Sequence, residues 1–335
     1  MKPPPPARDR VLAALRHASV RPVPVGAVTQ SATRAQMAAV GVLWPEAHLD
    51  PQLMAALAEA AHSVLGFDLV RVPFDQTIEA SLLGAEVNLG DESSSPAVVS
   101  HPLTFDSPIP PLPSLGAARP KAVIGAIGIL RRRLGSDAAV VGGLVGPFTL
   151  VCQLIGISSV LMAGLRRPDA LRPFLDFAVQ LGAAYARRQV AAGADAICVE
   201  DMSASLDLTS PLLYKNLILP AQTELVSAIG APVILHVCGA NTKILDLLAR
   251  TGADALSLES KTDLEKAAAL DGTALIGAVD PVGVLLHGTL GDVRRASLAC
   301  LEAGVHILAP GCGLPLETPT ANLLEMARVA REWRH

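Results

Sequence analysis

The stretch Gly252-Ala-Asp-Ala-Leu-Ser-Leu-Glu259 indicates the fold class, and Gly193-Ala-Asp-Ala-Ile-Cys-Val-Glu200 repeats its pattern. Each stretch opens with Gly-Ala-Asp, which is typical of a helix that stops immediately before a strand, and continues as a short apolar run of strand length. The same alternation of short apolar runs and helical patterns extends over nearly the whole chain of 335 residues. This order predicts parallel strands joined by helices, as in a single TIM-type (β/α)8 barrel.

Eight apolar runs are predicted strands, and eight helical patterns separate them. The predicted strands are Val23–Thr29, Leu69–Phe74, Ala139–Val145, Ala196–Glu200, Val233–Cys238, Ala255–Glu259, Ala274–Val279 and His306–Ala309. The predicted helices are Pro51–Leu65, Pro120–Leu134, Pro168–Ala192, Pro211–Ile229, Thr242–Thr251, Asp263–Leu270, Gly291–Ala303 and Pro319–Trp333.

Two regions depart from this regular order. Residues 1–10 contain a proline cluster and are expected to form a disordered tail, so that residues 11–335 make up a single barrel domain. Residues 88–118 are rich in Ser and Pro and follow the second predicted strand, which suggests a hairpin with a long loop. We expect this insertion to lie over the barrel mouth, although a surface loop without function is an equal alternative.

Composition narrows the classes of function. Hydrophobic residues make up 51% of the chain and charged residues 17%, which indicates a globular protein with a large aliphatic core. A net charge of −4 and an aromatic content of 3% argue against a nucleic-acid partner. Residues 138–165 carry no charge, but the glycines and proline in this run favour a buried strand, a turn and a core helix over a membrane span. Without an apolar signal segment near the start, we expect a cytoplasmic protein.

One histidine and two cysteines are predicted to meet at the barrel mouth. His236 and Cys238 end the fifth predicted strand and, being two residues apart, share one face of it. Cys312 follows the eighth strand, whose end opens on the same face of a barrel. A histidine and two cysteines form a favourable zinc site with an open fourth position. The alternative is that all three are core residues without a metal.

Acidic residues close the fourth, sixth and seventh predicted strands. Glu259 could supply a fourth, displaceable oxygen ligand to zinc, or could pair with Lys261 or Lys266 at the rim. Glu200, Asp201 and Asp280 are candidate substrate-binding residues. For Asp201 and Asp280, capping of the following helix is at least as good an explanation. The five cysteines are odd in number and widely spaced, which favours free thiols or metal ligands over disulfides. Cys152 and Cys300 lie within helical patterns and Cys198 lies within a predicted strand, so these three are expected to be core residues.

These motifs together resemble the zinc-dependent methylcobamide:coenzyme M methyltransferases of the uroporphyrinogen decarboxylase superfamily. The resemblance rests on six blocks, which are His236-Val-Cys-Gly-Ala-Asn, Leu256-Ser-Leu-Glu259, Ile276-Gly-Ala-Val-Asp280-Pro, Ile307-Leu-Ala-Pro-Gly-Cys312-Gly, Val42-Leu-Trp-Pro-Glu-Ala-His48 and Val72-Pro-Phe-Asp-Gln-Thr-Ile-Glu79. It implies one TIM-type barrel with Zn²⁺ on His236, Cys238 and Cys312, and Glu259 as a ligand when substrate is absent.

The resemblance also implies an activity, namely methyl transfer from a methyl-Co(III) corrinoid such as methylcobalamin to a small thiol such as coenzyme M. A corrinoid carrier protein would then be a partner. The chain departs from the family in lacking a glycine-rich turn after the first strand, where it has Ala27-Val-Thr-Gln-Ser-Ala32. Alternatives are therefore a different acceptor, such as homocysteine or a folate, and a corrinoid-binding barrel without turnover. A uroporphyrinogen decarboxylase-like activity is a further alternative, although Arg21 and Arg34 are few for a highly anionic tetrapyrrole.

Overall fold

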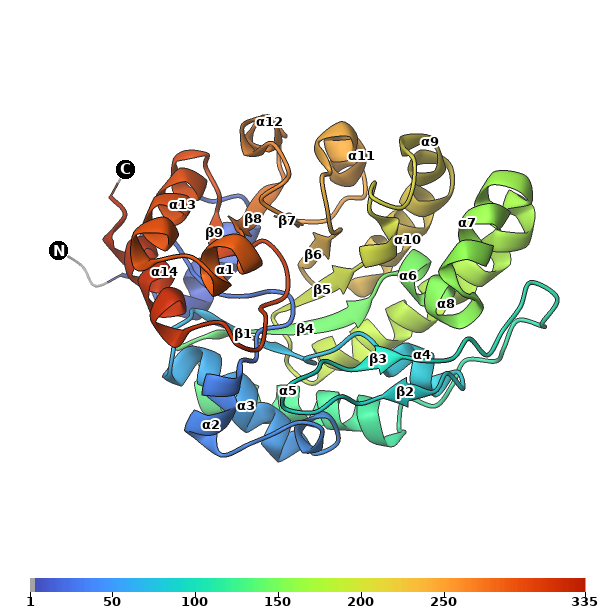
Figure 1. The fold of residues 1–335 in the computed structure, drawn as a ribbon, viewed down its shortest axis with the longest axis horizontal. Coiled ribbons are helices and arrows are strands. Elements are labelled where there is room, and N and C mark those ends of the chain that lie inside the picture. Colours follow the sequence, from blue (N-terminus) through green and yellow to red (C-terminus); the bar gives the residue numbers. More distant parts are fainter. Residues whose placement is uncertain (1–3, 335) are drawn as a thin grey trace.

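A curled parallel sheet of seven strands forms the centre of the molecule. The computed structural model describes residues 4–334, and seven of the eight predicted strands form this sheet in the order β1-β4-β5-β6-β7-β8-β9. Figure 1 shows these strands around one interior, with helices on the outer side. The strands are β1 Leu69–Val72, β4 Ala139–Val145, β5 Ala196–Glu200, β6 Val233–His236, β7 Ala255–Leu258, β8 Ala274–Val279 and β9 Ile307–Pro310.

The remaining predicted strand, Val23–Thr29, is not a regular strand. It forms a single parallel bridge, between Val25 and Leu308 of β9. On its other side the carbonyl of Val25 accepts a hydrogen bond of 2.8 Å from the amide of Asp68, next to β1. Because Pro24 has no N–H group, the segment cannot continue a full ladder. It nevertheless hydrogen-bonds to both edges of the sheet.

Helices follow most strands. They are α1 Ala7–Leu15, α2 Arg34–Val40, α3 Pro51–Ser63, α4 Ile78–Leu82, α5 Ala118–Leu134, α6 Pro147–Ile155, α7 Ile157–Arg166, α8 Pro168–Ala191, α9 Pro211–Leu213, α10 Leu219–Ile229, α11 Leu245–Ala249, α12 Leu264–Ala268, α13 Leu290–Glu302 and α14 Thr320–Glu332. Short 3-10 or π turns are η1 Glu46–His48, η2 Met202–Ala204, η3 Tyr214–Ile218, η4 Thr242–Ile244 and η5 Pro281–Leu286. The single helix predicted for Pro211–Ile229 is thus divided into α9, η3 and α10.

The uncharged run at residues 138–165 contains β4, α6 and α7. Among the described residues, no individual helix has both the length and the apolar character to cross a bilayer. The pair α6 and α7 meets these criteria only when the two helices are taken together, and their axes bend by 113° at the break between them.

The first residues differ from the predicted disordered tail. Helix α1 begins at Ala7, so the prediction for residues 1–10 is wrong for its last four residues, and residues 1–3 lie outside the described part. Arg8 lies 2.8 Å from Asp195, and Arg10 lies 2.5 Å from Asp68. These two ion pairs attach α1 to residues that immediately precede β5 and β1. The charged residues after the proline cluster therefore belong to a helix that is packed against the sheet.

The region 88–118 contains the end of a short antiparallel hairpin, β2 Val87–Asn88 with β3 Ala97–Val98. Beyond β3 the chain lies against α6, since the amide of Leu103 donates to the carbonyl of Leu154 at 2.9 Å and His101 Nδ1 lies 2.8 Å from the carbonyl of Gln153. Whether the region covers the mouth of a barrel stays a prediction.

The interior changes from apolar to polar along the strands. One buried apolar cluster joins residues of α1 to strand side chains, among them Val11, Leu15, Leu69, Cys198 and Ile234. Successive residues on one face of a strand are two apart, so this face next carries Arg71, Glu200 and His236. Chemistry-bearing side chains are therefore collected at the carboxyl end of the sheet, above an apolar floor.

Candidate functional site

Four potential metal ligands converge at the carboxyl end of the sheet. His236 is the last residue of β6, Cys238 lies two residues beyond it, and Glu259 and Cys312 follow β7 and β9. One ligand atom from each of the four residues lies within 4.8 Å of all the others. The structure thus brings together all four residues that the sequence predicts as metal ligands.

The distances within this cluster suit a small cation. Nε2 of His236 lies 3.4 Å from Sγ of Cys238 and 3.6 Å from Sγ of Cys312, and the two sulfur atoms are 3.8 Å apart. Nδ1 of His236 lies 3.2 Å from the carbonyl oxygen of Ser257, which can only accept a hydrogen bond. The proton of the neutral ring therefore belongs on Nδ1, and Nε2 is left as a ligand. Two thiols, one imidazole and one carboxylate are the donors that zinc prefers.

The electrostatics of the cluster favour a bound cation. A hydrogen bond from Cys238 lowers the pKa of Cys312 to about 4, and the contact with His236 acts in the same direction, although burial opposes the shift. The same contact with Cys312, together with burial, raises the pKa of Cys238. Burial lowers the pKa of His236, but the hydrogen bond and negative charge of Cys312 outweigh this effect and raise it overall. Two sulfurs and one imidazole thus share protons that a metal ion would replace.

Glu200 lies beside this cluster, and two residues not identified from the sequence hold it there. Glu200 is paired with His236 in the register of β5 and β6. Arg71 forms a buried ion pair with one carboxylate oxygen, and the amide of Gln76 donates to the other. Burial raises the pKa of Glu200, and the charge of Arg71 opposes that shift. A single arginine inside the apolar run Leu69–Val72 is the sequence signal that could have revealed this pair.

Gly143 makes the position of Arg71 sterically possible. A Cβ atom at residue 143 would lie 2.5 Å from a terminal nitrogen of Arg71. The glycine of β4 therefore provides the space that the guanidinium occupies inside the sheet.

The other two predicted substrate-binding residues make structural contacts. Asp201 is fully buried and accepts hydrogen bonds from the amide and hydroxyl of Thr149, both at 2.7 Å, and from Gln222 at 2.9 Å. Asp201 thereby accepts from a donor in the first turn of α6 and does not cap the turn η2 that follows Asp201 in the chain. Asp280 caps η5 by accepting from the amides of Val282 and Gly283, both at 2.9 Å. Neither belongs to the cluster of metal ligands.

Lys266, one of the two lysines considered as a partner of Glu259, pairs with a different carboxylate. The ammonium of Lys266 lies 3.1 Å from Asp263, which caps α12. Cys152, Cys198 and Cys300 are buried and free, away from the four ligands.

A second polar cluster lies after β1. Arg119 of α5 binds both carboxylate oxygens of Asp75 at 2.8 Å, and Thr77 donates to the same carboxylate through its amide and hydroxyl. Nδ1 of His48 lies 3.4 Å from Asp75. Burial lowers the pKa of His48 to about 4 despite the charge of Asp75, so that at neutral pH the ring is uncharged. The sequence motifs contain His48, Asp75 and Thr77 but do not indicate that these residues meet Arg119.

A cavity of about 250 Å³ lies beside this cluster, since Asp75 and Thr77 are part of its wall. Its walls come from the segments after several strands and from the hairpin, and it is lined by Gln30, Phe74, Asp75, Gln76, Thr77, Ser95, Pro96, Ala97, Val98, Gln153 and Met202. None of the four metal ligands is among these residues.

A family model described as uroporphyrinogen decarboxylase (URO-D) matches residues 6–333, which include the complete cluster of ligands. The chain belongs to the uroporphyrinogen decarboxylase family.

Within this family, the chain is similar to methyltransferases over its full length. Methylcobamide:CoM methyltransferase MtbA of Methanosarcina mazei is 37% identical over 336 residues, and the match covers 98% of both chains. MtaA of Methanosarcina barkeri (strain Fusaro) is 34% identical over 331 residues, covering 97% of this chain and 98% of the relative. A solved structure described as a methyltransferase from Methanosarcina mazei has a TM-score of 0.94 at 34% identity, with 98% of both chains covered. The resemblance predicted from the six sequence blocks is confirmed.

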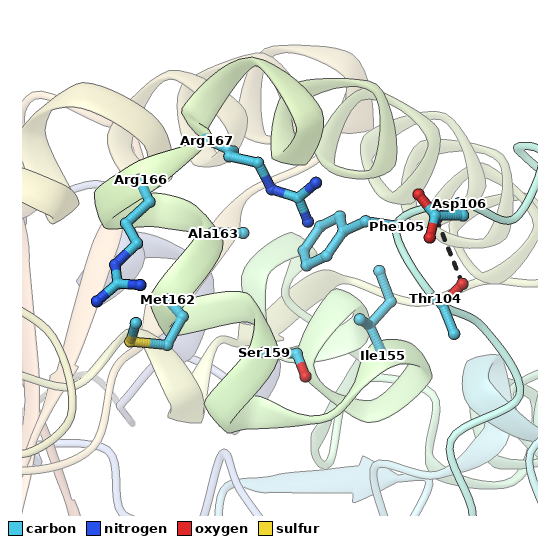
Figure 2. Close-up of a pocket in the computed structure, with 9 residues that line it drawn as sticks. All are labelled: Thr104, Phe105, Asp106, Ile155, Ser159, Met162, Ala163, Arg166 and Arg167. Atoms are coloured by element: carbon cyan, nitrogen blue, oxygen red, sulfur yellow. Dashed lines mark hydrogen bonds between the residues drawn. The ribbon is translucent and has the colours of Figure 1, made fainter.

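This member of the uroporphyrinogen decarboxylase family also has a cavity of about 490 Å³ formed by α6, α7 and residues 104–106. Figure 2 shows its lining, in which the guanidinium of Arg167 lies over the ring of Phe105 at 5.7 Å from the centroid. No predicted site residue lines this cavity. We therefore base the function on the cluster of His236, Cys238, Glu259 and Cys312.

Proposed function

We propose that this protein is a zinc-dependent methyltransferase that moves a methyl group from a methyl-Co(III) corrinoid to a small thiol such as coenzyme M. The observation that carries the proposal is the convergence of His236, Cys238, Glu259 and Cys312 at the carboxyl end of the sheet. The similarity to proteins named methylcobamide:CoM methyltransferase supports the same reaction class.

The residues fit a metal that activates a thiol. Bound zinc would stabilise the deprotonated form of a coordinated substrate sulfur near neutral pH. His236, Cys238 and Cys312 would be the permanent ligands, and Glu259 would give up its position to the substrate. Ser257 would keep Nε2 of His236 directed at the metal through its contacts with Nδ1. The two cysteine thiolates would leave the substrate sulfur electron-rich.

The methyl transfer itself requires positioning. The substrate sulfur would form a bond to the methyl carbon while the cobalt–carbon bond breaks, and both electrons of the broken bond would remain on cobalt, which passes from Co(III) to Co(I). The thiol proton would leave to solvent when the sulfur binds. Such a displacement needs the methyl-carrying corrinoid at the open end of the sheet, with its methyl group facing the substrate sulfur. We propose that a corrinoid carrier protein presents it there.

We propose that the fold is a closed (β/α)8 barrel, because the segment Val23–Thr29 hydrogen-bonds to both β9 and the residue before β1. In this proposal the described chain from α1 onward forms one domain, and residues 88–118 lie over the mouth. The hairpin residues that line the 250 Å³ cavity support that placement.

A spectroscopic assay tests the proposed function. Zinc-loaded protein is mixed with methylcobalamin and a panel of thiols, including coenzyme M and homocysteine, and loss of the methylcobalamin absorbance is followed under anaerobic conditions. We expect demethylation that depends on thiol, zinc and protein and is lost in Cys312→Ala. Absence of thiol-dependent demethylation in zinc-loaded protein, with free methylcobalamin and with a corrinoid protein, would refute the proposal.

A further inference from the structure

Two of the candidate metal ligands lie beyond the hydrogen-bonded ladder of the sheet. The paired register of β6 and β7 ends at His236 and Ser257, so Cys238 and Glu259 stand in the loops that follow these strands. Strand pairing therefore fixes His236 but does not by itself fix the other two. Backbone groups beyond a ladder need other partners, and here those partners decide where Cys238 and Glu259 are held.

The side chain of Asn241 supplies donors to the loop after β6. Its Nδ2 donates to the carbonyl of Val237 at 2.6 Å and to the carbonyl of Cys238 at 3.3 Å. Because both partners are carbonyl oxygens, they fix which end of the amide is the nitrogen. Asn241 is fully buried, so water does not compete for these donors. One side chain thus holds the peptide groups on both sides of Cys238.

Thr262, three residues after Glu259, connects this loop to the loop after β7. Its hydroxyl accepts from the amide of Asn241 at 3.1 Å and donates to the carbonyl of Gly239 at 3.3 Å. Its own amide donates to the carbonyl of Glu259 at 2.9 Å, which closes a turn. Thr262 is buried. The backbone segments that carry Cys238 and Glu259 are therefore connected through one buried hydroxyl group.

The loop after β9 packs against the same segment. A Cβ atom at Gly311 would lie 3.1 Å from Cα of Glu259 and 3.2 Å from the amide nitrogen of Ser260. The glycine next to Cys312 thus lets two loop backbones approach closely. The loop that carries Glu259 therefore contacts both of the loops that carry a cysteine of the cluster.

We propose that Asn241 and Thr262 are positioning residues of the metal site, which hold Cys238 and Glu259 in place before the ion binds. This inference rests on the proposed function and adds to it two residues that act through the ligands. Ligands oriented in advance lose less conformational freedom when the metal binds. Loss of a contact that orients a ligand typically weakens metal binding by about 10–100-fold.

The zinc affinity of Thr262 variants tests the connection between the loops. The dissociation constant is measured on purified, metal-free protein by competition with a chromophoric chelator. We expect Thr262→Val, which keeps the shape of the side chain but removes its hydroxyl, to raise the Kd for zinc by about tenfold or more. Thr262→Ser retains a hydroxyl and should recover most of the affinity.

Thr251→Val is the matched control. Thr251 is also buried, and its hydroxyl accepts from the amide of Ala253 at 3.3 Å and donates to the carbonyl of Leu248 at 2.6 Å. These contacts precede β7, at the opposite end of the strand from Glu259. Thr251→Val should lose comparable stability against urea but keep the Kd for zinc. An equal loss of zinc affinity in both valine variants would show a general effect of stability and would overturn the inference.

Cobalt(II) in place of zinc reports the geometry of the site without turnover. Absorption spectra of Co(II)-loaded protein are recorded in the absence of corrinoid. We expect altered ligand-field bands in Thr262→Val and in Asn241→Asp, because the latter replaces a donor with an acceptor beside two carbonyl oxygens. Thr262→Ser and Thr251→Val should keep the spectrum of the unmodified protein.

The two proposals can fail separately. A changed Kd and Co(II) spectrum in Thr262→Val and Asn241→Asp would support the positioning role even if the unmodified protein does not demethylate methylcobalamin, in which case the proposed function fails. An unchanged Kd and spectrum in both variants would overturn the positioning role, whether or not methyl transfer is observed. Thiol-dependent demethylation would then still support the proposed function.

Discussion

His236 is held from both ends of its ring. Nδ1 contacts the carbonyl and hydroxyl of Ser257 on the neighbouring strand, and Nε2 faces the sulfur atoms of Cys238 and Cys312. The register of β6 and β7 pairs His236 with Ser257, so the orientation of the ring follows from strand pairing. A ligand that is oriented before the metal arrives loses less conformational freedom on binding it.

At this scale we predict the zinc content of cysteine variants. Purified protein should hold close to one zinc ion per chain, and Cys238→Ala or Cys312→Ala should lose most of it, because either change removes a thiolate ligand. Elemental analysis of dialysed protein measures this directly. Cys300→Ala is the control, since Cys300 is buried outside the cluster. Unchanged zinc in both Cys238→Ala and Cys312→Ala would contradict the assignment.

Several elements are joined by the polar cluster after β1. His48 comes from η1, Asp75 from the segment after β1, Glu79 from α4 and Arg119 from α5. Glu79 accepts a hydrogen bond of 2.9 Å from the amide of Val145, the last residue of β4. Burial raises the pKa of Glu79 to about 7 even though this hydrogen bond opposes the shift. The carboxyl group that connects α4 to β4 is thus a titrating group near neutral pH.

The contribution of Glu79 to stability has a defined sign. Its ordinary pKa is 4.5, so between pH 4.5 and about 7 the folded protein binds more protons at Glu79 than the unfolded chain does. Stability contributed by this group therefore falls as the pH rises through that window, by up to about 3 kcal/mol. His48 acts oppositely, because its pKa is lowered and its contribution falls as the pH decreases from 6.5 to about 4.

We predict that Glu79→Gln gains stability relative to the unmodified protein as the pH rises. The difference in the free energy of unfolding should grow from pH 4.5 to about 7 and then stay constant, since glutamine keeps an acceptor for Val145 without titrating. Urea denaturation of both proteins at matched pH values measures it, and the contribution of His48 cancels in the comparison. Glu86→Gln, at an exposed position, should show a constant difference. Parallel stability curves for Glu79→Gln would argue against a raised pKa.

At the scale of the whole molecule, one carboxylate links three parts of the chain. Asp68 accepts from the amide of Val25 at 2.9 Å with one oxygen and from Arg10 of α1 at 2.5 Å with the other. Its own amide donates to the carbonyl of Val25. The segment Val23–Thr29 lies between β9 and β1. Because Pro24 has no N–H group to donate, this segment depends on its hydrogen bonds with Asp68.

We predict that Asp68→Ala loosens this junction. The amide of Val25 and the guanidinium of Arg10 would lose their partner, which should lower the free energy of unfolding by about 2–3 kcal/mol. Hydrogen exchange should become faster at Val25 and Gly26 before it does in β5 or β6. Asp137→Ala, an exposed aspartate before β4, serves as the comparison and should change neither measurement. Unaltered exchange at Val25 would show that the junction does not depend on Asp68.

Local sequence was sufficient for seven of the eight predicted strands and for the convergence of the four candidate metal ligands. Short apolar runs that alternate with helical patterns predict seven strands where the sheet has them, because burial on both faces requires continuous apolar residues. The convergence of these residues could be predicted because His236 and Cys238 share a strand face and because the ends of parallel strands meet at one edge. Their spacing alone left a core role open, and the resemblance to a family reduced that ambiguity.

Tertiary structure decided what no local pattern encodes. Arg71 and Gln76 bind Glu200, which is more than a hundred residues away in the sequence. Asp201 accepts a hydrogen bond from α6 and not from the loop that follows it. Arg8 and Arg10 form ion pairs that attach a helix where a disordered tail was expected. Each of these roles depends on a partner distant in sequence, and the energy of a buried charge depends on that partner more than on its own neighbours in the chain. The apolar periodicity of a strand or helix is a local property and can be read from the sequence, whereas the partner of a buried polar group is set only when the chain closes on itself.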